Sequence, residues 1–215
     1  MTDELTKEQY ILDPCGTSST AYWKNYCFQK PDNIQILHEN DFSKEKYGYS
    51  HIIRYFRLIH HLKVLTPYKL DDKFYFQTVN PLSQIEVIRD IINCCYENTY
   101  ITIEQIEEWL NYKVYDSELW ILVIEKSSAF PIALGIADFD GEIKEGSLEW
   151  IQVLPEKRGC GIGKALVMEL LSRLQPKANF ATVSGQVDNK TNPEKLYRQC
   201  GFTGNDIWCV LHNAN

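Results

Sequence analysis

The sequence lacks the features that define several large functional classes. No apolar run approaches the length needed to cross a membrane, and residues 1–8 are polar and acidic, which argues against a secretory signal. No two cysteines have C-x-x-C spacing, and the five histidines do not combine with cysteines at the spacing of zinc ligands. We therefore expect a globular cytoplasmic protein with reduced thiols, no bound metal and no association with a membrane.

Positive charge is also scarce. The chain of 215 residues has 22 Lys and Arg against 29 Asp and Glu, a formal net charge of −7. Nucleic-acid binding generally needs a basic face, so this balance argues against it. The rest of the composition, 44% hydrophobic and 24% charged, is that of an ordinary globular protein. No internal repeat or low-complexity segment interrupts it.

The first third of the chain has the less regular pattern. Apolar residues recur at helical spacing over 45–62, which predicts a helix there, and Thr66-Pro67 follows it. We interpret residues 1–70 as an N-terminal extension, partly helical, whose role the sequence does not reveal. Residues 71–215 then form the main domain.

From residue 71 the pattern predicts a strand, two helices, three strands, a helix, a strand, a helix and a strand. Thr102 has capping-box spacing, Asp140-Gly141 indicates a hairpin turn, and Asn192-Pro193 indicates a helix start. This order predicts an α+β fold with a mixed sheet and helices on both of its faces. The predicted ranges are 73–79, 83–92, 102–110, 119–125, 130–139, 147–153, 161–174, 180–183, 193–200 and 207–211.

The most informative segment, Val153–Lys164, joins a predicted strand to a predicted helix. It reads V-L-P-E-K-R-G-C-G-I-G-K, in which an arginine precedes three alternating glycines. Bare backbone N–H groups at the positive end of a helix are suited to an anionic phosphate. Lys157, Arg158 and Lys164 make the segment locally basic. The sequence therefore predicts a site for a cofactor that carries a pyrophosphate.

Two familiar phosphate loops do not fit this segment. A P-loop would need glycine where Arg158 stands, five residues before Gly163, and Ser or Thr where Ala165 stands. A dinucleotide fingerprint that starts at Gly159 would need its third glycine where Lys164 stands. The pattern that remains is Arg-x-x-Gly-x-Gly.

Two motifs resemble those of the GNAT acetyltransferase superfamily. Arg158-Gly159-Cys160-Gly161-Ile162-Gly163 resembles its acetyl-CoA loop, and Leu196-Tyr197-Arg198-Gln199-Cys200-Gly201-Phe202 resembles its Leu-Tyr-x-x-x-Gly-Phe signature. The motifs and the element order agree over about residues 75–211. The resemblance implies a GNAT-like acyl-CoA N-acyltransferase fold, with a central mixed, mostly antiparallel sheet flanked by helices on both faces.

The resemblance also implies how acetyl-CoA would bind. The backbone of Ile151 and Val153 would pair with the pantetheine arm, and the Val153 N–H would polarise the thioester carbonyl. Backbone N–H groups of the loop would hold the pyrophosphate, and Arg158 would add charge. The other loop residues in this predicted site are Gly159, Gly161, Ile162, Gly163 and Lys164.

By the same resemblance, Tyr197 is the candidate general acid that protonates the departing CoA thiolate. A Tyr considered alone would more often be an aromatic residue packed on the sheet. The family often carries an Asn seven residues before this Tyr, where this chain has Lys190, with Asn189 and Asn192 beside it.

The amine acceptor must lose a proton before it attacks, so a base is needed within reach. Acidic residues gather over 138–149, where one lysine stands among five carboxylates. We prefer Glu149 as the base, because it lies in a strand in phase with Ile151 and Val153, and we rank Glu145 second.

The sequence thus predicts an N-acetyltransferase that moves an acetyl group from acetyl-CoA to a primary amine by direct attack in a ternary complex. The acceptor is a small molecule or a peptide, and the acidic residues favour a cationic one. The alternatives are a non-catalytic acyl-CoA-binding module used for sensing and a transferase for another acyl chain, such as succinyl or propionyl. His60-His61 is a weaker candidate base. A monomer and a homodimer are both compatible with the sequence.

Overall fold

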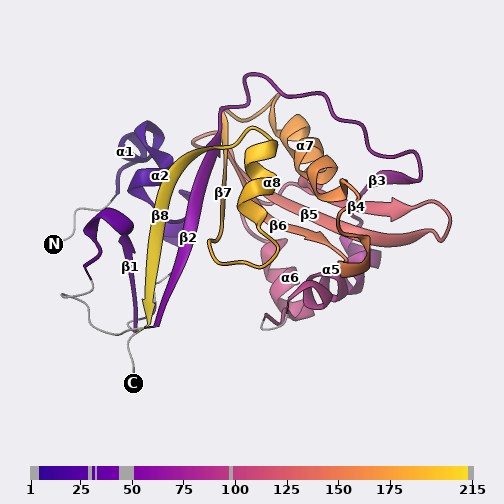
Figure 1. Cartoon of the computed structure of the whole chain (residues 1–215), viewed down its shortest axis with the longest axis horizontal. Helices are drawn as coiled ribbons and strands as arrows, with labels where there is room; N and C mark the ends of the chain where they lie inside the picture. Colours follow the sequence, from indigo (N-terminus) through magenta and orange to yellow (C-terminus); the bar gives the residue numbers. More distant parts are fainter. Residues whose placement is uncertain (1–4, 29–30, 32, 44–50, 97–98, 213–215) are drawn as a thin grey trace. The chain divides into compact units, whose positions relative to one another are not determined.

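After a mainly helical start, the described part of the chain has groups of consecutive strands separated by helices. The computed structural model describes residues 5–28, 31, 33–43, 51–96 and 99–212 (Figure 1). The helices are α1 (Lys7–Leu12), α2 (Pro14–Thr17), α3 (Lys24–Cys27), α5 (Pro81–Cys95), α6 (Ile103–Trp109), α7 (Ile162–Leu174) and α8 (Pro193–Gln199). The strands are β1 (Ile34–His38), β2 (His51–His60), β3 (Phe74–Thr78), β4 (Trp120–Glu125), β5 (Phe130–Asp140), β6 (Glu145–Val153), β7 (Phe180–Gln186) and β8 (Thr203–His212).

Two compact units divide the chain. Met1–His61 and Thr182–Asn215 form the first unit, and Leu62–Ala181 forms the second. The first unit therefore combines both ends of the chain. The boundary expected at residue 70 stays a prediction, and the units seen here are divided at other positions.

The second unit is a meander of antiparallel strands between two helical layers. Its strands follow the order β3-β4-β5-β6, and each pairs with the next in antiparallel register. Helix α7 covers one face, and α5 and α6 cover the other (Figure 1). Helix α7 approaches so closely that a Cβ added to Gly146 would lie 2.5 Å from Leu174 Cδ1. Glycine at that position lets the helix pack directly on the sheet.

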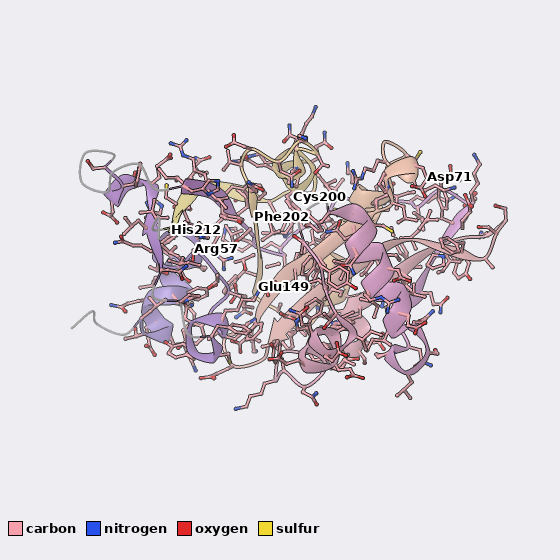
Figure 2. The ribbon with its side chains drawn as sticks, turned by 90° about the horizontal axis from the view of Figure 1, so that it is seen from below. Arg57, Asp71, Glu149, Cys200, Phe202 and His212 are labelled. Carbon is pink, nitrogen blue, oxygen red and sulfur yellow. The ribbon has the colours of Figure 1, made fainter. Side chains whose placement is uncertain are left out.

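The first unit places a strand from the N-terminal region between strands from the C-terminal region. Its strand order is β1-β8-β2-β7, and β8 is antiparallel to both β1 and β2. Arg57 of β2, only 2% exposed, donates hydrogen bonds to Tyr10 Oη at 2.8 Å, Thr182 Oγ1 at 3.2 Å and Ser184 Oγ at 3.0 Å (Figure 2). These bonds connect α1 and β7 to the centre of the unit.

The helix predicted over 45–62 is wrong for the residues that the structure describes. His51–His60 is strand β2, and residues 45–50 lie outside the described residues. The apolar positions of this segment fit a helical stripe, but the strand is partly buried on both faces. Short apolar runs of that kind do not distinguish a helix from a central strand.

The element order predicted from residue 71 onward is confirmed. The capping box at Thr102 and the Asn192 cap before Pro193 are both present, while α5 begins at Pro81 with Asn80 as its cap. Among the described residues, no helix is both long and apolar enough to cross a membrane.

Candidate active site

The glycine-rich loop connects β6 to α7 through a short 3-10 turn, Pro155–Lys157. Gly159 has a φ of +80° and Gly161 a φ of +77°, values that favour glycine. Gly161 is the N-cap of α7, and no side chain caps this helix. Within the described part of the chain, we find no acceptor for the backbone N–H groups of Gly159–Lys164. The loop thus presents donors at the positive end of a 13-residue helix.

The space over the loop is open at Gly159 and covered at Gly161. A Cβ added to Gly159 would meet no atom within 4 Å, whereas one added to Gly161 would lie 3.0 Å from Tyr68 Oη. The Tyr68 hydroxyl donates a hydrogen bond to the Gly161 carbonyl at 3.0 Å. Nothing in the sequence indicated Tyr68, because its segment has no motif or periodicity beyond the nearby Thr66-Pro67.

Only part of the expected basic cluster is available to a ligand. Lys157 Nζ lies 2.6 Å from Glu125 Oε1, and this hydrogen bond raises the pKa of Lys157 and lowers that of Glu125. Arg158 is exposed, and its Nε donates to the Val153 carbonyl at 3.1 Å. Lys164 is half-buried in the first turn of α7. Arg158 and Lys164 therefore supply the positive charge at the loop.

The register of β6 determines where its backbone groups point. The Leu154 N–H donates to the Ile132 carbonyl of the β5 side at 3.0 Å. Successive residues of a strand direct their backbone groups to opposite sides, so those of Val153 and Ile151 point away from β5. This is the orientation that pairing with a pantetheine arm would require.

A bulge interrupts the pairing of β6 with β5 at Glu149. Ile136 and Ala137, which are consecutive in β5, pair with Trp150 and Leu148. Glu149 between them has no partner in β5 and is the extra residue of the bulge. Its Oε1 accepts a hydrogen bond from Ser147 Oγ at 2.9 Å. Regular pairing is therefore interrupted at Glu149, which is half-buried on β6 (Figure 2), and its phase with Ile151 and Val153 stays a prediction.

The acidic residues of 138–149 do not form one open surface. Glu145 is 1% exposed and Asp140 is 8% exposed, whereas Glu142 is exposed. Asp140 Oδ1 accepts the Glu142 N–H at 2.9 Å and so stabilises the turn between β5 and β6. Glu149 is thus more accessible than Glu145.

Aromatic side chains surround Trp150, next to Glu149. The Trp150 ring stacks on Trp109 of α6, with centroids 5.6 Å apart and an interplanar angle of 22°. Tyr96 meets Trp150 edge-on at 5.9 Å, and its hydroxyl accepts a hydrogen bond from Gln152 Nε2 at 3.0 Å. Burial raises the pKa of Tyr96. No sequence motif indicated Tyr96 or Trp109, because their proximity depends on the packing of α5 and α6 against β6.

Tyr197 lies in α8, in the first unit. It is 7% exposed, and its ring packs against Phe56 at 6.1 Å and Phe202 at 5.7 Å. Cys200 is the C-cap of α8, and Phe202 comes two residues later (Figure 2). The described contacts of Tyr197 are those of a packed aromatic residue, and its role as a general acid stays a prediction.

The asparagines before Tyr197 organise the local backbone. Asn189 Oδ1 accepts hydrogen bonds from the Thr191 N–H at 2.9 Å and hydroxyl at 2.7 Å. Asn192 Oδ1 accepts the Lys195 N–H at 3.3 Å as the cap of α8. Both oxygens therefore already serve the fold. In addition, no group of three or more His, Cys, Asp or Glu among the described residues could hold a metal ion.

Comparisons with known proteins agree with this geometry. A family model for an acetyltransferase (GNAT) domain matches residues 116–204. A GCN5-related N-acetyltransferase from Sphaerobacter thermophilus is similar in fold, with a TM-score of 0.69 and 18% identity over 79% of this chain and 54% of that one. A second, from Kribbella flavida, has a TM-score of 0.57 and 15% identity over 85% and 68%. No curated protein matches the sequence.

A third solved structure contains a cofactor. The NatC complex bound to Gag peptide and CoA includes a chain with a TM-score of 0.53 and 19% identity, covering 66% of this chain and 99% of that one. These identities support likeness of fold alone, and the chain spans about half the length of the Sphaerobacter protein. The loop, the element order and the matched domain agree, and the fold is the mixed, mostly antiparallel GNAT sheet with flanking helices. Residues 116–204 therefore match the model of a GNAT acetyltransferase domain, and the fold is similar to that of solved GNAT proteins.

Proposed function

We propose that this protein is an N-acetyltransferase that moves an acetyl group from acetyl-CoA to a primary amine by direct attack in a ternary complex. One observation carries the proposal. The uncapped N-terminus of α7, with left-handed glycines at 159 and 161, directly follows a strand whose terminal backbone groups point away from its neighbour β5. That combination suits a ligand with an amide-bearing arm and a pyrophosphate.

The residues at the loop fit acetyl-CoA. The N–H groups of Gly159–Lys164 would bind the pyrophosphate, and the open space at Gly159 allows close approach. Arg158 and Lys164 would add charge. When bound, acetyl-CoA supplies the acetyl thioester. The Val153 N–H would then donate to the thioester oxygen as negative charge develops there.

Glu149 is the base we propose for the acceptor amine. A base has to reach the amine directly or through a water molecule, and Glu149 is half-buried whereas Glu145 is 1% exposed. The amine nitrogen would lose its proton to Glu149 and form the new C–N bond as the C–S bond breaks. Tyr197 would protonate the departing thiolate. If Glu149 is the base, Glu149→Gln should remove the rising limb of the pH–rate profile, while a retained limb would favour Glu145 or no protein base.

The acceptor class follows from the surroundings of Glu149. A half-buried carboxylate on β6, in a segment with four other acidic residues over 138–149, favours a cationic amine, because carboxylates attract positive charge. The NatC complex was solved with a peptide, so a peptide N-terminus is one acceptor to test beside polyamines, aminoglycosides and lysine side chains.

Two alternatives keep the same loop. A non-catalytic acyl-CoA sensor would bind the cofactor and release no thiol. A transferase for succinyl or propionyl groups would use the same phosphate contacts, because the loop reads the CoA phosphates and not the acyl chain. Thiol release with acetyl-CoA, succinyl-CoA and propionyl-CoA, each with the amine panel, separates the three cases.

The first test is thermal unfolding with acetyl-CoA, in parallel with NAD and ATP. A ligand at about a hundred times its dissociation constant stabilises the native state by roughly 2.7 kcal/mol. We expect a shift with acetyl-CoA alone. No shift with acetyl-CoA would mean that the loop is only a turn. Tyr197→Phe should then lower turnover far more than acetyl-CoA affinity, and an unchanged rate would refute its acid role.

A further inference from the structure

The segment Leu62–Asp72, which we call the strap, is tied to both ends of helix α7. At the C-terminal end of the helix, Gln175 Nε2 donates to the Leu62 carbonyl at 2.8 Å. At the N-terminal end, Tyr68 Oη donates to the Gly161 carbonyl at 3.0 Å. The strap contains no helix or strand, so these side-chain bonds determine where it lies on the helix.

Between its two ends the strap is not closely packed on the helix. A cavity of about 270 Å³ separates it from α7, and Val64 is 82% exposed. The strap lines one side of the cavity with Leu65 to Tyr68, and α7 lines the other with Ala165, Met168 and Glu169 among others. The bond from Tyr68 is therefore a local attachment to the loop, separable from the core beneath α7.

This attachment acts on a peptide group of the cofactor loop. The Gly161 carbonyl accepts two hydrogen bonds, from Tyr68 Oη at 3.0 Å and from the Ala165 N–H at 3.1 Å. The next peptide bond is trans and planar, so the Ile162 N–H points opposite to that carbonyl. Fixing the carbonyl therefore fixes an N–H group that lies in the proposed pyrophosphate site. The Ala165 N–H already restrains this peptide plane, and the Tyr68 hydroxyl adds a second restraint at a glycine, the residue with the greatest backbone freedom.

We propose that Tyr68 is a positioning residue of the cofactor site, whose hydroxyl holds the Gly161–Ile162 peptide plane in the orientation that binds the pyrophosphate. The inference rests on the proposed function, since it assumes that the loop binds acetyl-CoA. The loop would thereby depend on Tyr68, a residue outside both GNAT motifs. The loop would then be ordered before the ligand binds, so binding would not have to offset the entropy lost on ordering it.

Calorimetric titration with CoA tests the inference through Tyr68→Phe, which removes the hydroxyl and keeps the ring. We expect CoA to bind about three- to tenfold more weakly, the range expected for one hydrogen bond. Binding of pantetheine, which has no pyrophosphate, should stay the same. The matched control is Tyr75→Phe, because Tyr75 is 42% exposed against 38% for Tyr68 and its hydroxyl makes no hydrogen bond among the described residues. Equal CoA affinity in wild type and Tyr68→Phe, or equal losses for CoA and pantetheine, would overturn the inference.

A second readout does not need the cofactor. In unliganded protein, the amide resonance of Ile162 should move in Tyr68→Phe and stay in place in Tyr75→Phe, because only the first change alters the hydrogen bonds of the adjoining carbonyl. An unmoved Ile162 resonance overturns the positioning role. If wild-type protein binds no CoA but the Ile162 resonance still moves in Tyr68→Phe, the proposed function is overturned. The contact between Tyr68 and the loop is established all the same. The two failures are thus distinguishable.

Discussion

At the scale of single residues, both the backbone conformation and the packing at position 201 favour glycine. Its φ is +94°, and an added Cβ would lie 2.9 Å from His60 Nε2. We expect Gly201→Ala to lower the free energy of unfolding by about 1–3 kcal/mol, because it combines backbone strain with overpacking. Urea denaturation measures the loss. The control is Gly141→Ala, whose Cβ would meet nothing closer than Phe139 Cε1 at 3.7 Å. Equal midpoints for the two variants would contradict the prediction.

His60 makes stability depend on pH. Burial, with a smaller effect from the neighbouring His61, lowers the pKa of His60 from 6.5. The unfolded chain then binds more protons than the folded one between the two pKa values, so stability is full above about pH 6.5 and falls as the pH drops toward the folded pKa. Denaturation at a series of pH values should show this slope in wild type and lose it in His60→Gln. His61→Gln should retain most of it, and an unchanged slope in His60→Gln would refute the assignment.

The residues of the site differ in how far the sequence could predict them. The glycines and Arg158 carry a local pattern, and the backbone directions of Ile151 and Val153 follow from strand alternation. The bulge at Glu149 could not be predicted, because it depends on how β5 and β6 pair and leaves no mark in the pattern of β6 itself. Tyr68 was missed for a related reason. Its partner is 93 residues away, so only tertiary structure brings the two together.

At the scale of elements, the start of α8 depends on Asn192 in two ways. Its Oδ1 caps the helix, and its φ is +49°, a conformation that Asn tolerates better than most residues. We expect Asn192→Ala to cost about 1–3 kcal/mol of unfolding free energy, because it loses the cap and strains the backbone. Asn192→Gly loses the cap alone and should cost only a few tenths. Chemical denaturation compares the two, and equal costs would mean that the backbone conformation contributes nothing.

The correct and incorrect element predictions share one physical cause. Helix α8 and the α6 capping box are specified by neighbouring residues, and the sequence located both. Strand β2 is specified by pairing with β8, in one register from His51–His212 to Arg57–Asp206 and shifted at Ile59–Thr203. Its own apolar spacing fits a helix equally well, and only the distant partner decides between the two.

At the scale of the whole molecule, the two ends of the chain build one unit. Strand β8 lies between β1 and β2, and both partners come from the first 61 residues. The sequence suggested an extension added to a complete domain, since motif and periodicity are concentrated after residue 71. Pairing between strands at opposite ends of the chain has no local signal, so this architecture could not be read from the sequence.

A chain truncated to residues 62–215 tests that architecture, because it keeps the second unit whole and removes both neighbours of β8. Cys209 and Leu211, 0% and 1% exposed in the full chain, would lose their cover, and the freed edges of β8 would offer unpaired backbone groups. We expect a lower urea midpoint, a broader transition and binding of a hydrophobic dye that the full chain does not bind. Adding residues 1–61 as a separate fragment should restore part of the loss, because the strand pairing does not require a continuous chain. A truncated protein with the midpoint of the full chain would mean that residues 1–61 are a dispensable extension after all.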